Sequence, residues 1–187
     1  MNIQLSVDGV VTDIPGHVVS RLALCLDGTA PSQRKALILL AHHGDYEVRA
    51  AVASKPGLSK ECYLRLANDA SVDVLSSLLR NPSFHCYALM GAYQKIVERD
   101  PRLRHELSMC LDMVKAELCL ELGRWLISLD DYKVRWAMAN SIRTPAALLR
   151  LLADDETPCV AETARHRLAG IEGRPITTPT QSLRSEW

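Results

Sequence analysis

A spacing of 26 residues recurs along this chain, and it limits the possible folds more than any other feature of the sequence. Four leucines are each followed eight positions later by a valine: Leu40 and Val48, Leu66 and Val74, Leu126 and Val134, and Leu152 and Val160. Within the first two pairs, and again within the last two, equivalent positions lie 26 residues apart. A fixed period of about 20 to 50 residues is typical of arrays built from one repeated structural unit.

The text around these anchors predicts two short helices in each unit. Apolar residues follow each valine at the fourth position, and in two units also at the third, as Ala51 and Val52 follow Val48, which marks one face of an α-helix. Residues suited to N-caps stand where the helices should begin: Asp45, Ser71 and Asp131 before the valine helices, and Ser59 and Thr144 before the next ones. Pro56 and Pro82 are expected to end two of the valine helices. A helix pair cannot bury its apolar face alone, so successive pairs should stack on one another.

The regular spacing is lost over residues 83–128, which we interpret as an enlarged central repeat. Two longer helices are expected here, with their boundary at Asp100 and Pro101. The second helix should carry one apolar stripe, formed by Leu103, Leu107, Leu111, Val114, Leu118 and Leu122. A helical repeat domain is therefore predicted over residues 15–170.

The two ends of the chain have a different composition. Residues 1–14 alternate in polarity around Asp8 and Gly9, which indicates a β-hairpin, although two strands alone are marginally stable in water. Residues 171–187 are polar and rich in Pro, Gly, Thr and Ser, and we expect them to form a flexible tail.

The stretch DYEVRAAVASKPGLSKECYLRLANDASVDVLSSLLRNP, residues 45–82, resembles the leucine-rich repeat variant family, a branch of the HEAT-like superfamily. The acid, the Val-Arg pair, Ala-Val-Ala and the proline are similar to that family's pattern. The resemblance implies an all-α solenoid of short α-α repeats. Arg49 and Arg135 keep the arginine that follows the valine, whereas Leu75 and Ala161 replace it. A cysteine cluster of the kind that the family's iron-sulfur member carries is not visible, so no cofactor is expected.

The balance of charge weighs against nucleic acid as the partner. Lys plus Arg and Asp plus Glu both number 22, and no segment forms a basic block. Proteins that bind nucleic acid normally gather positive charge, because the contacts to phosphate supply much of the affinity. A protein or peptide partner is therefore favoured.

The same survey yields no sign of catalysis, metal binding or membrane insertion. No phosphate-binding loop, zinc-protease motif or nucleophile elbow is found, so we expect a protein that is not an enzyme and holds no metal. No apolar run approaches the length that spans a bilayer. The six cysteines form no CxxC pair, and we interpret them as small core residues of a cytoplasmic protein.

Trp136 is the leading candidate for a partner-binding residue. It lies two positions after Val134, roughly 200° around the helix from the buried stripe. The other units place Ala50, Ser76 and Glu162 at this position, so it is expected to face water. An exposed tryptophan is a common anchor for a partner. The alternative is that the enlarged central repeat covers Trp136.

Tyr132, Arg49 and Arg135 complete the candidate binding residues. The arginines suit an anionic partner, or alternatively each pairs with an acid of the next repeat. The hypothesis favoured by the whole sequence is a non-enzymatic scaffold that binds another protein. The alternative is a nucleic-acid-binding protein related to HEAT-like DNA glycosylases, which use a basic concave face.

Overall fold

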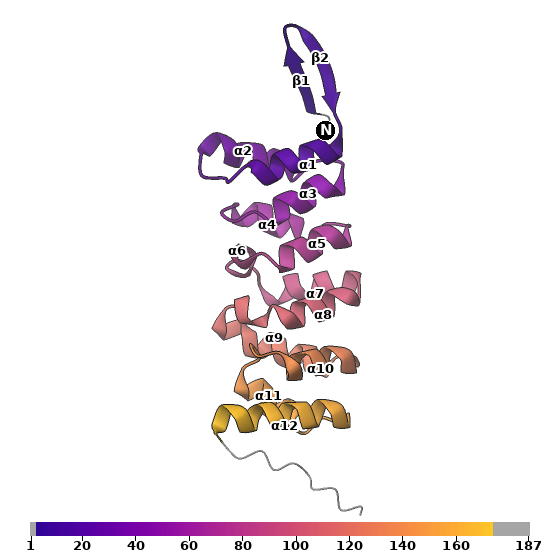
Figure 1. The fold of residues 1–187 in the computed structure, drawn as a ribbon, viewed down its shortest axis with the longest axis vertical. Helices are drawn as coiled ribbons and strands as arrows, with labels where there is room; N and C mark the ends of the chain where they lie inside the picture. The colour runs from indigo at the N-terminus through magenta and orange to yellow at the C-terminus, as the bar shows by residue number, and fades with distance from the viewer. Residues whose placement is uncertain (1–2, 174–187) are drawn as a thin grey trace, which may run out of the picture.

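The computed structural model describes residues 3–173, which are mostly helical with one small two-stranded antiparallel sheet. The helices lie in successive layers along the long axis of the molecule, from the hairpin at one end to α12 at the other (Figure 1). None of the helices in this range is both long enough and apolar enough to cross a bilayer.

The hairpin predicted for residues 1–14 is confirmed. Strands β1 (Ile3–Val7) and β2 (Val10–Ile14) pair with Val7 opposite Val10. Asp8 and Gly9 both have positive φ angles, 50° and 81°, which a two-residue hairpin turn requires and which these residue types tolerate. The hairpin extends beyond α1, away from the helical layers (Figure 1).

Six helices form a continuous row, here called the first row, in which each helix contacts the next. Its members are α1 (Gly16–Cys25), α3 (Tyr46–Ala53), α5 (Val72–Leu79), α8 (Arg102–Met109), α10 (Tyr132–Asn140) and α12 (Pro158–Glu172). The helices between them are α2 (Pro31–Leu40), α4 (Lys60–Leu66), α6 (Pro82–His85), α7 (Met90–Arg99), α9 (Ala116–Ser128) and α11 (Ala146–Leu152).

The eight anchor residues of the 26-residue spacing are all buried, as the pattern predicts. Three of the five expected caps form: Asp45 accepts from the Glu47 amide, Ser59 from the Cys62 amide and Asp131 from the Lys133 amide. Ser71 stands at the start of α5 as expected, but its side chain makes no cap hydrogen bond. The cap predicted at Thr144 is wrong. Pro145 has an extended ψ of 143°, so α11 begins at Ala146, one residue later than predicted. The Thr144 hydroxyl therefore makes no hydrogen bond to the first amides of α11.

The prediction of one long helix after Pro101 is also wrong, because the α-helix is interrupted between Cys110 and Lys115. A 3₁₀ turn, η1 (Leu111–Met113), separates α8 from α9. The apolar residues on both sides of the break remain buried or partly buried. The apolar residues of the stripe are therefore buried by two separate helices, although their spacing also fits a single α-helix.

The segment that lacks the regular spacing nevertheless contains a repeat-like helix. Asp100 accepts from the Arg102 amide, as Asp45 and Asp131 do at their own helices, and Leu103 is buried like the valines. Val19 of α1 is likewise buried near the start of its helix. The equivalent residues of the first row are Val19, Val48, Val74, Leu103, Val134 and Val160, spaced by 26 to 31 residues.

Two further predictions need correction. Cys62, Cys110 and Cys119 are buried, but the other three cysteines are exposed, so only half of the set serves the core. Helix α12 continues to Glu172 and ends at Gly173, whose φ of 64° suits a glycine C-cap. The flexible tail predicted from residue 171 therefore does not include 171–173, and residues 174–187 lie outside the described range.

Candidate functional site

The four candidate residues fall into two classes in the structure. Trp136 and Tyr132 are exposed on α10, whereas the side chain of Arg135 is only 7% exposed and that of Arg49 is also largely buried. Each arginine pairs with an acid of the next repeat, which is the alternative role predicted for it.

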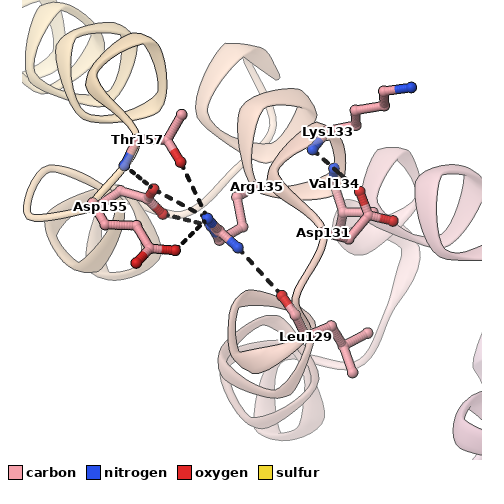
Figure 2. Close-up of polar contacts among 8 residues, drawn as sticks. Leu129, Asp131, Lys133, Val134, Arg135, Asp155 and Thr157 are labelled. Carbon is pink, nitrogen blue, oxygen red and sulfur yellow. Dashed lines mark hydrogen bonds and ion pairs between the residues drawn. The ribbon is translucent and has the colours of Figure 1, made fainter.

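Arg135 ties α10 to the turn that precedes α12 (Figure 2). Its Nε donates to Asp155 Oδ2 at 2.7 Å, and Nη1 donates to the carbonyl oxygen of Leu129 at 3.3 Å. Nη2 donates to Glu156 and Thr157, both at 3.2 Å. Asp155 in turn accepts from the Thr157 amide at 2.9 Å. All three nitrogens of the guanidinium are occupied within the chain.

Arg49 forms the same arrangement one repeat pair earlier. Its Nε donates to Asp69 Oδ2 at 2.7 Å, and Nη1 donates to the carbonyl of His43 at 2.8 Å. Asp69 accepts from the Ser71 amide at 2.9 Å. Burial alone would raise the pKa of Asp69, but the hydrogen bonds from Arg49 and Ser71 hold it below its usual value. Both arginines therefore connect successive repeats.

Trp136 lines a pocket of about 540 Å³ between α8 and α10. The pocket, here called the Trp136 groove, is lined by His105, Met109, Trp136, Ala137, Asn140, Ser141, Ile142 and Arg143. Trp136 is 44% exposed and Ile142 is 85% exposed, so large apolar side chains meet solvent here. None of the lining residues is acidic, although Arg143 is paired with Asp112 at 2.8 Å outside the groove.

The helix periodicity explains which side chains meet in the groove. On α8 the exposed stripe contains His105 and Met109, and on α10 it contains Trp136 and Asn140. Because α8 and α10 are neighbours in the first row, the two stripes lie side by side. The sequence alone could not place Met109 or Ile142 beside Trp136, since both belong to segments where the regular spacing is lost or ends.

Tyr132 lies one turn before Trp136 but opens onto a separate hollow. That hollow is lined by the polar turn around Asp131 together with Lys133, Glu156 and Thr157. The Arg135 cluster forms part of its wall. Tyr132 is therefore an exposed neighbour of the Trp136 groove and not a part of it.

Among the buried side chains of the described residues, Arg104 Nε and Thr144 Oγ1 have no hydrogen-bond partner, whereas the buried His85 ring is satisfied within the fold. His85 is buried, with Nδ1 2.8 Å from the Tyr93 hydroxyl and Nε2 2.7 Å from the Leu79 carbonyl. Burial lowers the pKa of His85, so its ring is neutral and donates from Nε2 to that carbonyl. Within residues 3–173, no group of three or more His, Cys, Asp or Glu side chains is placed to hold a metal ion.

Comparisons of the chain with protein-family models, with curated proteins and with solved structures found no match.

Proposed function

We propose that this protein is a HEAT-like α-solenoid that binds a segment of another protein in the Trp136 groove. The observation that carries the proposal is the exposure of Trp136 beside Met109 and Ile142 in a pocket of about 540 Å³. Tryptophan is among the residues that contribute most to binding energy at interfaces, especially in a recess that excludes water. The six first-row helices each contact the next, and their buried residues recur at intervals of 26 to 31 positions, which supports the solenoid part of the proposal.

The chemistry of the groove defines the partner that it fits. Met109, Trp136, Ala137 and Ile142 form the apolar part of its lining, which suits a large aliphatic or aromatic side chain as the anchor. His105 and Arg143 line the groove, exposed Lys133 lies one turn away on α10, and no lining residue is acidic. Acidic residues flanking the anchor would meet complementary charge at this rim. The proposed ligand is therefore a peptide segment with an apolar anchor between acidic residues.

A peptide selection with the purified chain tests this proposal. Peptides selected from a random display library are labelled, and their affinity is measured by fluorescence polarisation. Trp136→Ala should weaken binding by about tenfold or more, and Ile142→Ser should weaken it to a lesser degree. Tyr46→Ala is the matched control, because Tyr46 is 46% exposed on the equivalent helix α3.

The result that overturns the proposal is equal affinity in the Trp136→Ala chain and the unmodified chain. Labelled single-stranded RNA and DNA are assayed in parallel at low salt. If an oligonucleotide binds in a way that depends on Trp136 while no selected peptide does, the groove is a nucleic-acid site and the peptide proposal fails.

The proposed function involves no catalytic step, metal or cofactor, and we place it in the cytoplasm. Every cysteine of the chain lies within the described residues, and all six are free thiols. Free thiols in this number are usual in a reducing compartment and uncommon in secreted proteins.

A further inference from the structure

A polar hollow of about 440 Å³ lies beside the Arg49 cluster, here called the Arg65 hollow. It is formed by α3, α4 and the turns next to them, in a different layer from the Trp136 groove (Figure 1). Its lining residues are His43, Arg49, Arg65, Asn68, Asp69 and Ala70. Both carboxylate oxygens of Asp69 already accept from Arg49. The second arginine of the lining therefore adds a positive charge that this pair does not balance.

Arg65 and His43 have N–H groups that no other group in the described part of the chain accepts. Arg65 is exposed and donates from Nη1 to the Ala41 carbonyl at 2.8 Å, which leaves Nε and Nη2. His43 is only 8% exposed, and its Nδ1 accepts from the Asp45 amide at 3.1 Å. The ring proton is therefore on Nε2, which is not fully enclosed. A buried imidazole and an exposed guanidinium thus offer donors to one hollow.

The Arg135 cluster shows which group takes this place when the chain itself supplies it. Nη2 of Arg135 donates to Glu156 at 3.2 Å, and Glu156 directly follows the main acid partner of this arginine. In the Arg49 cluster, Ala70 follows Asp69. Arg49 therefore uses four of its five N–H groups within the chain and keeps one on Nη2.

The residues around the two clusters differ consistently in chemistry. At the positions of Leu129, Leu151, Asp154 and Glu156 around Arg135, the Arg49 cluster has His43, Arg65, Asn68 and Ala70. Hydrogen-bond donors thus replace two leucines, and uncharged residues replace two acids. The link between repeats requires only the Arg–Asp pair that both clusters share. These four differences are therefore not explained by the structural role of Arg49.

We propose that the Arg65 hollow binds the carboxylate of an acidic side chain from a partner protein. The carboxylate takes the place that Glu156 has beside Arg135, and it accepts from Arg65, from His43 Nε2 and from the remaining N–H of Arg49. Guanidinium groups bind carboxylates through strong, charge-assisted hydrogen bonds. This site is independent of the Trp136 groove.

The charge and the acceptors of the hollow favour a peptide carboxylate over a phosphate ion. Two arginines and one aspartate give the lining a net charge of +1, which matches one carboxylate and is too small for a dianion. Asn68 donates from Nδ2 to the Leu64 carbonyl at 2.7 Å, so its Oδ1 remains an acceptor. A backbone N–H of a peptide can donate to this oxygen, whereas a phosphate dianion has no N–H to offer.

Titration of the ¹⁵N-labelled chain with the peptide acetyl-Gly-Glu-Gly-amide at low salt, followed by NMR, tests the proposal. The backbone amide signals of Asn68 and Ala70 and the Nε–H signal of Arg65 should shift and saturate. One carboxylate should give a Kd on the order of 1 mM. The peptide acetyl-Gly-Gln-Gly-amide should leave these signals in place. Added NaCl should weaken the binding of the glutamate peptide.

Two substitutions test the site from opposite directions. Arg65→Gln removes the main cation, and Ala70→Glu supplies a carboxylate from the chain, so each should weaken binding by about tenfold or more. Ala70→Gln has a similar size without the charge and should weaken binding less than Ala70→Glu. Arg34→Gln is the matched control for Arg65→Gln, because Arg34 is also exposed and donates to a backbone carbonyl. Helicity by circular dichroism should be unchanged in all four variants.

Equal shifts with the glutamine peptide, or no shift with about 20 mM of the glutamate peptide, overturn the proposal. Equal affinity of the unmodified and Arg65→Gln chains does so too. Inorganic phosphate is titrated in the same way, and tighter binding of phosphate than of the glutamate peptide would show a general anion site instead. Trp136→Ala should leave binding of the glutamate peptide unchanged, which separates this result from the test of the groove.

Discussion

Arg135 illustrates how a single residue can look like a binding residue and serve the fold instead. The sequence shows a cationic side chain next to an exposed tryptophan, and an anionic partner was a reasonable expectation. In the structure the guanidinium is enclosed and donates to Asp155 at 2.7 Å, whose side chain is only 5% exposed. The pair crosses from one repeat to the next, so its removal should affect stability throughout the array.

Replacement of Arg135 should therefore be costly. Arg135→Ala leaves the buried Asp155 carboxylate without its main partner, and the free energy of unfolding should fall by about 3 to 5 kcal/mol. Arg143→Ala removes an arginine whose side chain is 56% exposed and should cost about 1 kcal/mol or less. Urea denaturation followed by circular dichroism measures both. Similar losses for the two variants would contradict a structural role for Arg135.

His85 makes stability depend on pH in a defined direction. Burial lowers its pKa in the folded state below 6.5, so between the two values the unfolded chain binds more protons at this site. Folding stability should therefore decrease as the pH falls below about 6.5, by at most about 1.4 kcal/mol per pH unit from this group. Well above pH 6.5 the ring is neutral in both states and has no effect on the slope.

The measurement is the free energy of unfolding at several pH values between about 5 and 7.5. His85→Gln keeps a polar side chain but removes the titrating ring, so its stability should depend less on pH than that of the unmodified chain. His42→Gln, at an exposed position after α2, is the control and should follow the unmodified profile. A His85→Gln profile parallel to the unmodified one would refute the linkage.

At the scale of elements, hydrogen bonds between layers reproduce the repeat. The Asn81 side chain donates to the carbonyls of Ala53 and Lys55, at 2.7 and 2.8 Å. Arg167, at the same place after Val160, donates to the carbonyls of Ala139 and Ser141. In both cases the polar residue lies seven positions after the valine of its repeat. It donates to carbonyl oxygens at the C-terminal end of the preceding first-row helix, α3 or α10. The polar character of this position is visible in the sequence, but its carbonyl partners are not.

The contact between α9 and α11 depends on a glycine. A Cβ added at Gly123 would lie 2.3 Å from Leu148 Cδ1, inside any permitted contact distance. Gly123→Ala should destabilise the protein by about 1 to 3 kcal/mol, although alanine is the better helix former. Gly91→Ala, also within a helix but with open space around it, should instead stabilise by about 0.5 to 1 kcal/mol.

Thermal denaturation of the two variants gives the comparison, and the opposite signs are the test. Adding Leu148→Val to Gly123→Ala should restore part of the lost stability, because it withdraws the atoms that the new methyl group meets. A Gly123→Ala variant as stable as Gly91→Ala would show that α9 and α11 separate at little cost.

At the scale of the whole molecule, the proposed binding groove and the hairpin lie in different layers. The groove is lined by residues of α8, of α10 and of the turn after α10, whereas the hairpin extends beyond α1 at the far end of the molecule (Figure 1).

The sequence alone determined the units of this protein. Helix starts, the buried valines and the hairpin turn depend on neighbouring residues and on short periods, so they can be read without the rest of the chain. Asp45, Asp131, Asp8 and Gly9 are where these local rules place them.

Only the tertiary structure decided which side chains remain available to a partner. Arg135 is enclosed because Asp155 of the next repeat lies opposite it. The break before α9 and the meeting of Met109 with Trp136 likewise depend on neighbouring layers. Packing between layers brings together residues that are far apart in sequence. A local sequence pattern does not show which distant residues will pack against it.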